Sequence, residues 1–286
     1  MSEAQKSPVL GVVSYLLLAF GLAWIPWILF LPNRFGGNLA EFELIALPGA
    51  FAPALATFIV RKWITREGFA DAGLGLHLGK WPYYLFGWLL PCAVVAFICL
   101  AAAAFGIAQP NFTPPAIAAH LPHWIPDADA KYVLPLASLI NALVATPLLF
   151  GEEFGWRGYL QLRLFPTRPT LAALVTGLVW GPWHWPVLAR GYDAVGSPLV
   201  TLGMLTVSAI FLAIIFGWIR RKTGSVWATS LAHSATNAIG GSLTVLWFAN
   251  PSSAIFTSYL GFLAWIPLGL LCVWIIARTQ RSVPAQ

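Results

Sequence analysis

Residues 148–165, LLFGEEFGWRGYLQLRLF, place two adjacent glutamates and an arginine inside a run of leucine, phenylalanine and tryptophan. The rest of the chain is equally apolar, because 59% of its 286 residues are hydrophobic, 9% are charged and the mean hydropathy is +0.76. A soluble globular domain carries far more charge than this. The composition therefore predicts an all-α, polytopic membrane protein, and the lipid bilayer is its first expected partner.

A bilayer core of about 30 Å is crossed by about 20 helical residues, and by this measure we expect about eight transmembrane helices. Their approximate limits are residues 9–31, 44–64, 82–107, 133–163, 170–189, 198–219, 225–248 and 253–277. The first is too long for a signal-peptide core and precedes no small-residue cleavage site, so we expect it to stay uncleaved. We divide the chain into an N-terminal part with three helices and their loops (1–132), a core (133–250), and a C-terminal helix with a short tail (251–286).

The basic residues indicate an orientation rather than a nucleic-acid partner, because they are scattered between apolar runs despite a net charge of +6. With eight helices, both termini share one side with the connections after the second, fourth and sixth helices. Leaving Arg157 aside, that side holds twelve basic residues and the other side three. The positive-inside rule then puts both termini in the cytoplasm, and we expect a multi-pass protein of a bacterial cell membrane. Cys92, Cys99 and Cys272 lie in apolar runs, with neither metal-type spacing nor a disulfide framework.

Four polar residues are expected at similar depth below the cytoplasmic face. Glu152 lies sixteen residues before Arg168 in the turn FPTRPT, and His184 lies sixteen after it, so antiparallel helices bring the two together. His233 follows the basic turn RRKTGS by about eight residues, or roughly 12 Å of helix, and Asn237 lies one turn deeper.

Each of these residues also has a structural interpretation. Glu153 and Arg157, four residues apart, suggest an ion pair within one helix, but this pair leaves Glu152 without a partner, and a carboxylate inside a span is functional by default. His184 could be an interior histidine beside a packing kink made by Pro182 and Pro186. His233 and Asn237 could make hydrogen bonds between helices.

Three motifs on successive predicted helices form a pattern. They are E-E-x-x-x-R, aromatic-x-x-x-H and H-x-x-x-N, represented by Glu152, Glu153 and Arg157, by Trp180 and His184, and by His233 and Asn237. This pattern resembles the CPBP family of intramembrane proteases, which is related to the type II CAAX endopeptidase and includes bacteriocin-processing and abortive-infection proteins. The resemblance covers roughly residues 133–250, which makes this part a CPBP-like catalytic core. Trp180 departs from the pattern, which more often has phenylalanine there.

The resemblance implies an endopeptidase that cleaves a membrane-associated or prenylated, CAAX-type protein or peptide within the membrane. By this analogy Glu152 is the general base, sharing a water molecule with His184, while His233 and Asn237 polarise the carbonyl of the substrate. Glu153 and Arg157 look structural, and Trp180 supports the site. Either no metal is required, or Glu152, His184 and His233 hold a zinc ion, as the metalloprotease label often given to the family implies.

Two other classes of function use the same residues. A proton-coupled transporter would employ the buried polar cluster as a relay, although such proteins usually have repeated halves, and neither GEEFGWR nor GPWHW recurs in the first 130 residues. A non-catalytic membrane scaffold would need the fold without a complete set of motifs, whereas every motif position is filled here.

Overall fold

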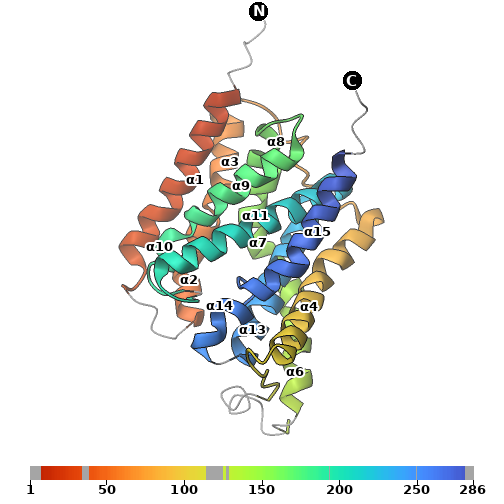
Figure 1. The fold of residues 1–286 in the computed structure, drawn as a ribbon. Helices are drawn as coiled ribbons and strands as arrows, with labels where there is room; N and C mark the ends of the chain where they lie inside the picture. The colour runs from red at the N-terminus through yellow and green to blue at the C-terminus, as the bar shows by residue number, and fades with distance from the viewer. Residues whose placement is uncertain are drawn as a thin grey trace, which may run out of the picture.

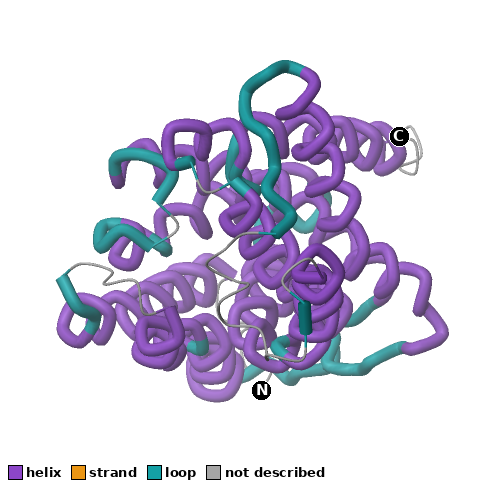
Figure 2. The backbone as a smooth tube through the Cα atoms, turned by 90° about the horizontal axis from the view of Figure 1, so that it is seen from below, coloured by secondary structure: helices purple, strands orange, loops and turns teal. Residues whose placement is uncertain are grey.

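The computed structural model describes residues 8–33, 39–113, 125–126, 129–192, 194–248 and 250–280. Lys6, Arg34 and Arg281, which entered the charge count above, lie outside these residues, as do both chain termini. Each regular element within the described ranges is a helix (Figure 1 and Figure 2), so the predicted all-α class is confirmed.

The α-helices, in chain order, are α1 (Pro8–Phe30), α2 (Leu39–Ala50), α3 (Ala52–Ile59), α4 (Trp81–Ala104), α6 (Ala130–Val144), α7 (Thr146–Gly155), α8 (Gln161–Arg163), α9 (Pro169–Trp183), α10 (Trp185–Leu188), α11 (Pro198–Thr223), α12 (Val226–Ala235), α13 (Ser242–Trp247), α14 (Ala254–Thr257) and α15 (Phe262–Gln280). The segments η1 (Val60–Ile64), η4 (Trp156–Leu160) and η5 (Thr236–Gly241) are π-helical and continue α3, α7 and α12. The segments η2 (Leu78–Lys80) and η6 (Pro251–Ser253) are short 3-10 helices.

Within the described ranges, five helices are long and apolar enough to cross a membrane, and a sixth span results if one bent pair is counted. The five are Val9–Phe30, Leu44–Ile64, Leu78–Ala104, Pro198–Thr223 and Ala254–Gln280. The bent pair is Lys131–Val144 and Thr146–Arg163, whose axes differ by 53°. These helices fit a multi-pass membrane protein, but they do not show the eight spans expected from the sequence.

The two expected spans that are missing from this set are 170–189 and 225–248. The first is cut short because α9 ends at Trp183 after 15 residues, about 22 Å at 1.5 Å per residue. The second forms α12, η5 and α13 in continuous succession, but residues 225–248 contain four serines, three threonines, one histidine and one asparagine. It is therefore less apolar than a membrane-crossing helix requires.

The three basic connections do meet at one end of the molecule, as the sequence predicted. Arg61, at the end of the second span, donates to the carboxylate of Asp71 at 2.7 Å and to the carbonyl of Gly158 at 2.9 Å. Arg163 donates to the same carboxylate at 2.7 Å, and Arg220 donates to the Asp71 carbonyl at 2.7 Å. The first turn of α1 and the last turn of α15 lie at this end too, near α8 at the top of Figure 1. We call it the basic end.

Asp71 is the acceptor that joins these connections. Partial burial raises the pKa of its carboxyl group, but hydrogen bonds and charge from Arg61 and Arg163 outweigh that effect and lower the pKa to about 2. The carboxylate is therefore ionised at neutral pH and links the loop after the second span to α8.

Small residues bring α9 and α11 into close contact. A Cβ atom added at Gly177 would lie 2.5 Å from the Cα atom of Ile210, and one added at Gly181 would lie 2.7 Å from the Cα atom of Thr206. Glycines four residues apart thus let one helix lie against the backbone of the other, as is common between membrane helices. This contact fixes the position of the part of α9 that precedes His184.

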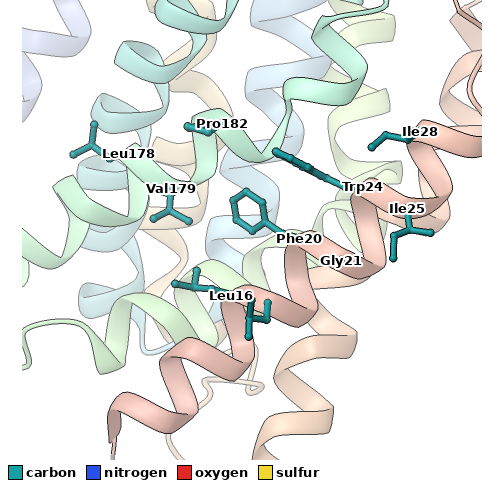
Figure 3. A pocket seen from close by; sticks show the side chains of 10 residues that line it. Leu16, Phe20, Gly21, Trp24, Ile25, Ile28, Leu178, Val179 and Pro182 are labelled. Atoms are coloured by element: carbon teal, nitrogen blue, oxygen red, sulfur yellow. The ribbon is translucent and has the colours of Figure 1, made fainter.

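An apolar groove of about 750 Å³ lies between α1 and α9. Figure 3 shows its lining, with Phe20 and Trp24 on α1 facing Val179 and Pro182 on α9. The lining is almost entirely carbon, and the groove opens on the outer surface of the helix bundle. It runs beside the segment that leads to His184.

Candidate active site

Glu152 lies in the last turns of α7 and is 7% exposed. Its Oε2 atom accepts two indole hydrogen bonds, from Trp180 Nε1 at 2.7 Å and from Trp156 Nε1 at 3.3 Å. Within the described part of the chain, no protein donor bonds to Oε1. The carboxylate is thus held through one oxygen atom, and the other remains an acceptor for a ligand or a water molecule.

The tight packing of α7 explains how this carboxylate is enclosed. A Cβ atom at Gly155, three residues after Glu152, would lie 2.6 Å from the hydroxyl oxygen of Tyr15 and 2.8 Å from the backbone of Pro53. A Cβ atom at Gly151 would lie 3.0 Å from the carbonyl oxygen of Ala50. Gly155 therefore lets α1 and α3 approach α7 beside the glutamate, and Gly151 does the same for the end of α2.

Tyr15 is a residue that the sequence analysis missed. Its ring is fully buried, and it packs edge-on against Trp156 with the centroids 5.9 Å apart. Its hydroxyl group is buried and makes no hydrogen bond to any described residue, although it lies against Gly155 on the Glu152 side of α7. A single tyrosine in the middle of an apolar first helix was the available signal.

His184 occupies the junction between α9 and α10. Its Nδ1 atom lies 2.9 Å from the carbonyl oxygen of Trp180, and because a carbonyl can only accept, Nδ1 carries the proton and donates. In the neutral ring Nε2 is then an acceptor. At the end of α9, the backbone N–H of His184 bonds to the carbonyl of Gly181 and not to that of Trp180. The Trp180 carbonyl is therefore free to accept the hydrogen bond that orients the imidazole ring.

His233, 4% exposed, is oriented by a carboxylate from another helix. Its Nδ1 atom lies 3.0 Å from Oε1 of Glu153, and the same oxygen accepts a hydrogen bond from Arg157 at 2.7 Å. Glu153 and Arg157 are both fully buried. The predicted ion pair is therefore confirmed, but the sequence did not show that Glu153 also holds the imidazole.

Trp180 connects these groups. Its indole donates to Glu152, its carbonyl orients His184, and its ring meets the His233 ring edge-on at 5.1 Å between centroids. The guanidinium carbon of Arg157 lies 4.4 Å from the centroid of the same indole, a cation–π distance. The departure from phenylalanine at this position thus adds a hydrogen-bond donor, because phenylalanine has no N–H group.

Asn237 differs from the other motif residues in its surroundings. It lies in the π-helix η5, its side chain is exposed, and among the described residues that side chain bonds to neither Glu152, His184 nor His233. Residues four apart share a face only in a regular α-helix, whereas α12 gives way to the π-helix η5 at Thr236, between His233 and Asn237. A role for Asn237 as an oxyanion donor stays a prediction.

The zinc alternative is not supported by the positions of the side chains. Across the described ranges, no three His, Cys, Asp or Glu side chains lie close enough to hold one metal ion. The Nδ1 atoms of both imidazoles are bonded to protein acceptors, Trp180 O for His184 and Glu153 Oε1 for His233, so their Nε2 atoms are the nitrogens that face other groups.

These positions can be compared with known proteins. No curated protein matches the chain significantly. Residues 132–239, which contain every motif residue described above, match the family model described as "Type II CAAX prenyl endopeptidase Rce1-like". The chain therefore carries a domain of the Rce1-like type II CAAX prenyl endopeptidase (CPBP) family.

Proposed function

We propose that the protein is an intramembrane endopeptidase that hydrolyses a peptide bond in a membrane-anchored, prenylated peptide or protein, with Glu152 as the general base. The observation that carries this proposal is the asymmetric hydrogen bonding of the Glu152 carboxylate. Two indole N–H groups hold Oε2, and this leaves Oε1 to take a proton from water.

In the proposed reaction, a water molecule bonded to Glu152 attacks the carbonyl carbon of the substrate. The new C–O bond forms as one proton of the water moves to the carboxylate. The tetrahedral oxyanion needs donors, and the imidazolium form of His233, whose Nδ1 donates to Glu153, is proposed to supply one from Nε2. Asn237 is the second proposed donor.

Collapse of the tetrahedral intermediate breaks the C–N bond and requires a proton on the leaving nitrogen. Protonated Glu152 returns the proton that it took from water, which completes a cycle with no net change in the enzyme. His184 is proposed to position the water through its Nε2 acceptor, since its Nδ1 proton is committed to the Trp180 carbonyl.

The substitution Glu152→Gln tests the assignment of the base. The glutamine amide keeps an oxygen for the two indole donors, but it cannot take a proton, so we expect kcat to fall about 10²- to 10⁴-fold with substrate binding retained. Cleavage of a prenylated, membrane-anchored peptide is followed by mass spectrometry. Glu67→Gln, the same change in a half-buried glutamate that pairs with Arg163 at the basic end, is the matched control. Wild-type turnover by Glu152→Gln would show that this glutamate is not the base.

The apolar groove between α1 and α9 supports a lipid-modified substrate, because its volume of about 750 Å³ can hold an isoprenyl chain beside the approach to His184. Gly21 lines it, and a Cβ atom there would meet nothing within 4 Å. Gly21→Leu should therefore narrow the groove and raise KM for a prenylated peptide more than for its unprenylated counterpart. Gly203→Leu, at another uncrowded helical glycine outside the groove, should change neither. If Gly21→Leu raised KM equally for both peptides, the groove would not be the binding site of the prenyl group.

A further inference from the structure

A second, smaller pocket lies at the basic end and is separate from the apolar groove. It has a volume of about 130 Å³ and lies between the turn that joins α8 to α9 and the last turns of α11. Gln161, Pro169 and Ala172 line one side, and Gly217, Arg220 and Arg221 line the other, with Arg157 contributing as well. By liquid volume it could hold roughly four water molecules, which suits a small polar group and excludes a peptide or an acyl chain.

The polar atoms around this pocket lack partners to an unusual degree. Nε and Nη2 of Arg157, Nε of Arg220 and Oε1 of Gln161 are all buried and make no hydrogen bond to the described part of the protein. Arg157 is fully buried and Arg220 is 9% exposed. Buried polar atoms without a partner are uncommon in native proteins and call for an explanation, and here three donor nitrogen atoms and one acceptor oxygen atom of this kind belong to residues that line one pocket.

The charges around the pocket are also unbalanced. Its lining holds three guanidinium groups and, within the described residues, no acidic side chain. Arg157 is matched by Glu153, but Arg220 donates to a main-chain carbonyl, that of Asp71, whose carboxylate is already bonded to Arg61 and Arg163. Among the described residues, no carboxylate is therefore hydrogen-bonded to Arg220 or Arg221 to neutralise its positive charge.

We propose that this pocket binds a phosphate group. Guanidinium groups bind phosphate oxygens through strong, charge-assisted hydrogen bonds, and α9 begins with Pro169 at the rim, so its N-terminus adds partial positive charge. The pocket lies where helix ends and basic turns gather, the level at which anionic headgroups lie in a membrane and at which basic pockets between helices bind them. The phosphate comes either from an anionic phospholipid or from solution.

Arg221→Gln tests this site without disturbing the core, because Arg221 is exposed and lines the pocket. The matched control is Lys222→Gln, which removes the same charge from the adjacent, exposed residue that does not line the pocket. Thermal unfolding is measured for the intact protein in nanodiscs of phosphatidylcholine with and without phosphatidylglycerol. It is also measured in detergent with inorganic phosphate or with chloride at the same ionic strength.

We expect phosphatidylglycerol or inorganic phosphate to raise the unfolding temperature of the wild type and of Lys222→Gln equally. The apparent affinity of Arg221→Gln for the same probe should be at least about tenfold weaker than that of the wild type. Ala172→Leu, which fills the pocket without altering charge, should abolish the effect. Stabilisation by phosphatidylglycerol alone identifies a lipid headgroup, and stabilisation by inorganic phosphate as well identifies a free anion site. Equal losses in Arg221→Gln and Lys222→Gln would reduce the effect to general surface charge and overturn the proposal, as would the absence of stabilisation in the wild type. None of these measurements requires proteolysis, so they stand apart from the test of Glu152.

Discussion

Removing the guanidinium group of Arg157 should destabilise the protein strongly, because Arg157 neutralises Glu153 in a fully buried ion pair. The two side chains are joined at 2.7 Å and neither is exposed to solvent. In the wild type, the side chains of Arg157 and His233 both bond to the Glu153 carboxylate. The substitution Arg157→Ala would leave His233 as the remaining partner of the two. The guanidinium group also stacks on Trp180 and Phe216, at 4.4 Å and 5.0 Å from the ring centroids, and this packing is lost too.

The size of the effect follows from these contacts. Breaking a buried ion pair by removing one partner costs about 3–5 kcal/mol, and a desolvated cation–π contact adds about 1–2 kcal/mol. Folded domains have total stabilities of about 5–15 kcal/mol, so the variant should lose a large fraction of its stability and accumulate poorly. At about 2 °C per kcal/mol for a domain of this size, Tm should fall by about 8 °C or more.

Thermal unfolding of purified protein in detergent measures this change, and two further variants define its cause. Glu153→Gln combined with Arg157→Met replaces the ion pair by neutral groups of similar volume and should recover most of the loss. Arg163→Ala removes an arginine from a partly exposed ion network at the basic end and should cost about 1 kcal/mol or less. If Arg157→Ala melted within about 2 °C of the wild type yet lost all turnover, the reasoning would be refuted and Arg157 would belong to the chemistry.

Three further predictions concern the fold. The pKa of Asp71, about 2 against an ordinary value of 3.8, means that its carboxylate stabilises the fold above about pH 4, and that this contribution is lost as the pH falls toward 2. The free energy of unfolding of the wild type should therefore fall by about 1 kcal/mol or less between pH 4 and pH 2 because of Asp71. Asp71→Asn should lack this contribution, and the same pH dependence of stability in both proteins would contradict the role of Asp71. Gly155→Ala would place a methyl group 2.6 Å from the Tyr15 hydroxyl and should cost about 1–3 kcal/mol, whereas Gly21→Ala, with nothing within 4 Å, should melt at or above the wild-type temperature. A cysteine at Arg168 should react with an impermeant thiol reagent only from the cytoplasmic side, and labelling from outside intact cells would reverse the proposed orientation.

The helical class and the long apolar spans could be predicted because they depend on local composition. A run of about 20 apolar residues must form a helix in a bilayer, since each backbone polar group needs a partner within the segment. The expected spans 170–189 and 225–248 are not among the helices long and apolar enough to cross a membrane, for different reasons. The first segment contains Pro182 and Pro186, and its long helix ends at Trp183, while the second is helical throughout but too polar.

Side-chain pairs within one helix could be predicted from the sequence, and side-chain pairs between helices could not. The bond between Glu153 and Arg157 follows from a spacing of four residues. The bond from His233 to the same carboxylate spans 80 residues, and no local pattern specifies it. Tyr15 is a similar case, since its hydroxyl group reaches the Glu152 face of α7 from α1, across more than 130 residues of chain.

The sequence by itself determined the helical membrane class, the gathering of the basic connections at one end, and the motif residues that place the domain in its family, because hydropathy, charge and spacing are properties of neighbouring residues. Only the tertiary structure decided that Trp180 holds Glu152, that Glu153 orients His233 and that three arginines line one small pocket. These arrangements depend on the relative rotation and depth of α7, α9, α11 and α12. Rotation and depth are set by close contacts such as those of Gly155, Gly177 and Gly181. They also depend on the π-helical segments η4 and η5, which shift the register of the helices that they continue, α7 and α12.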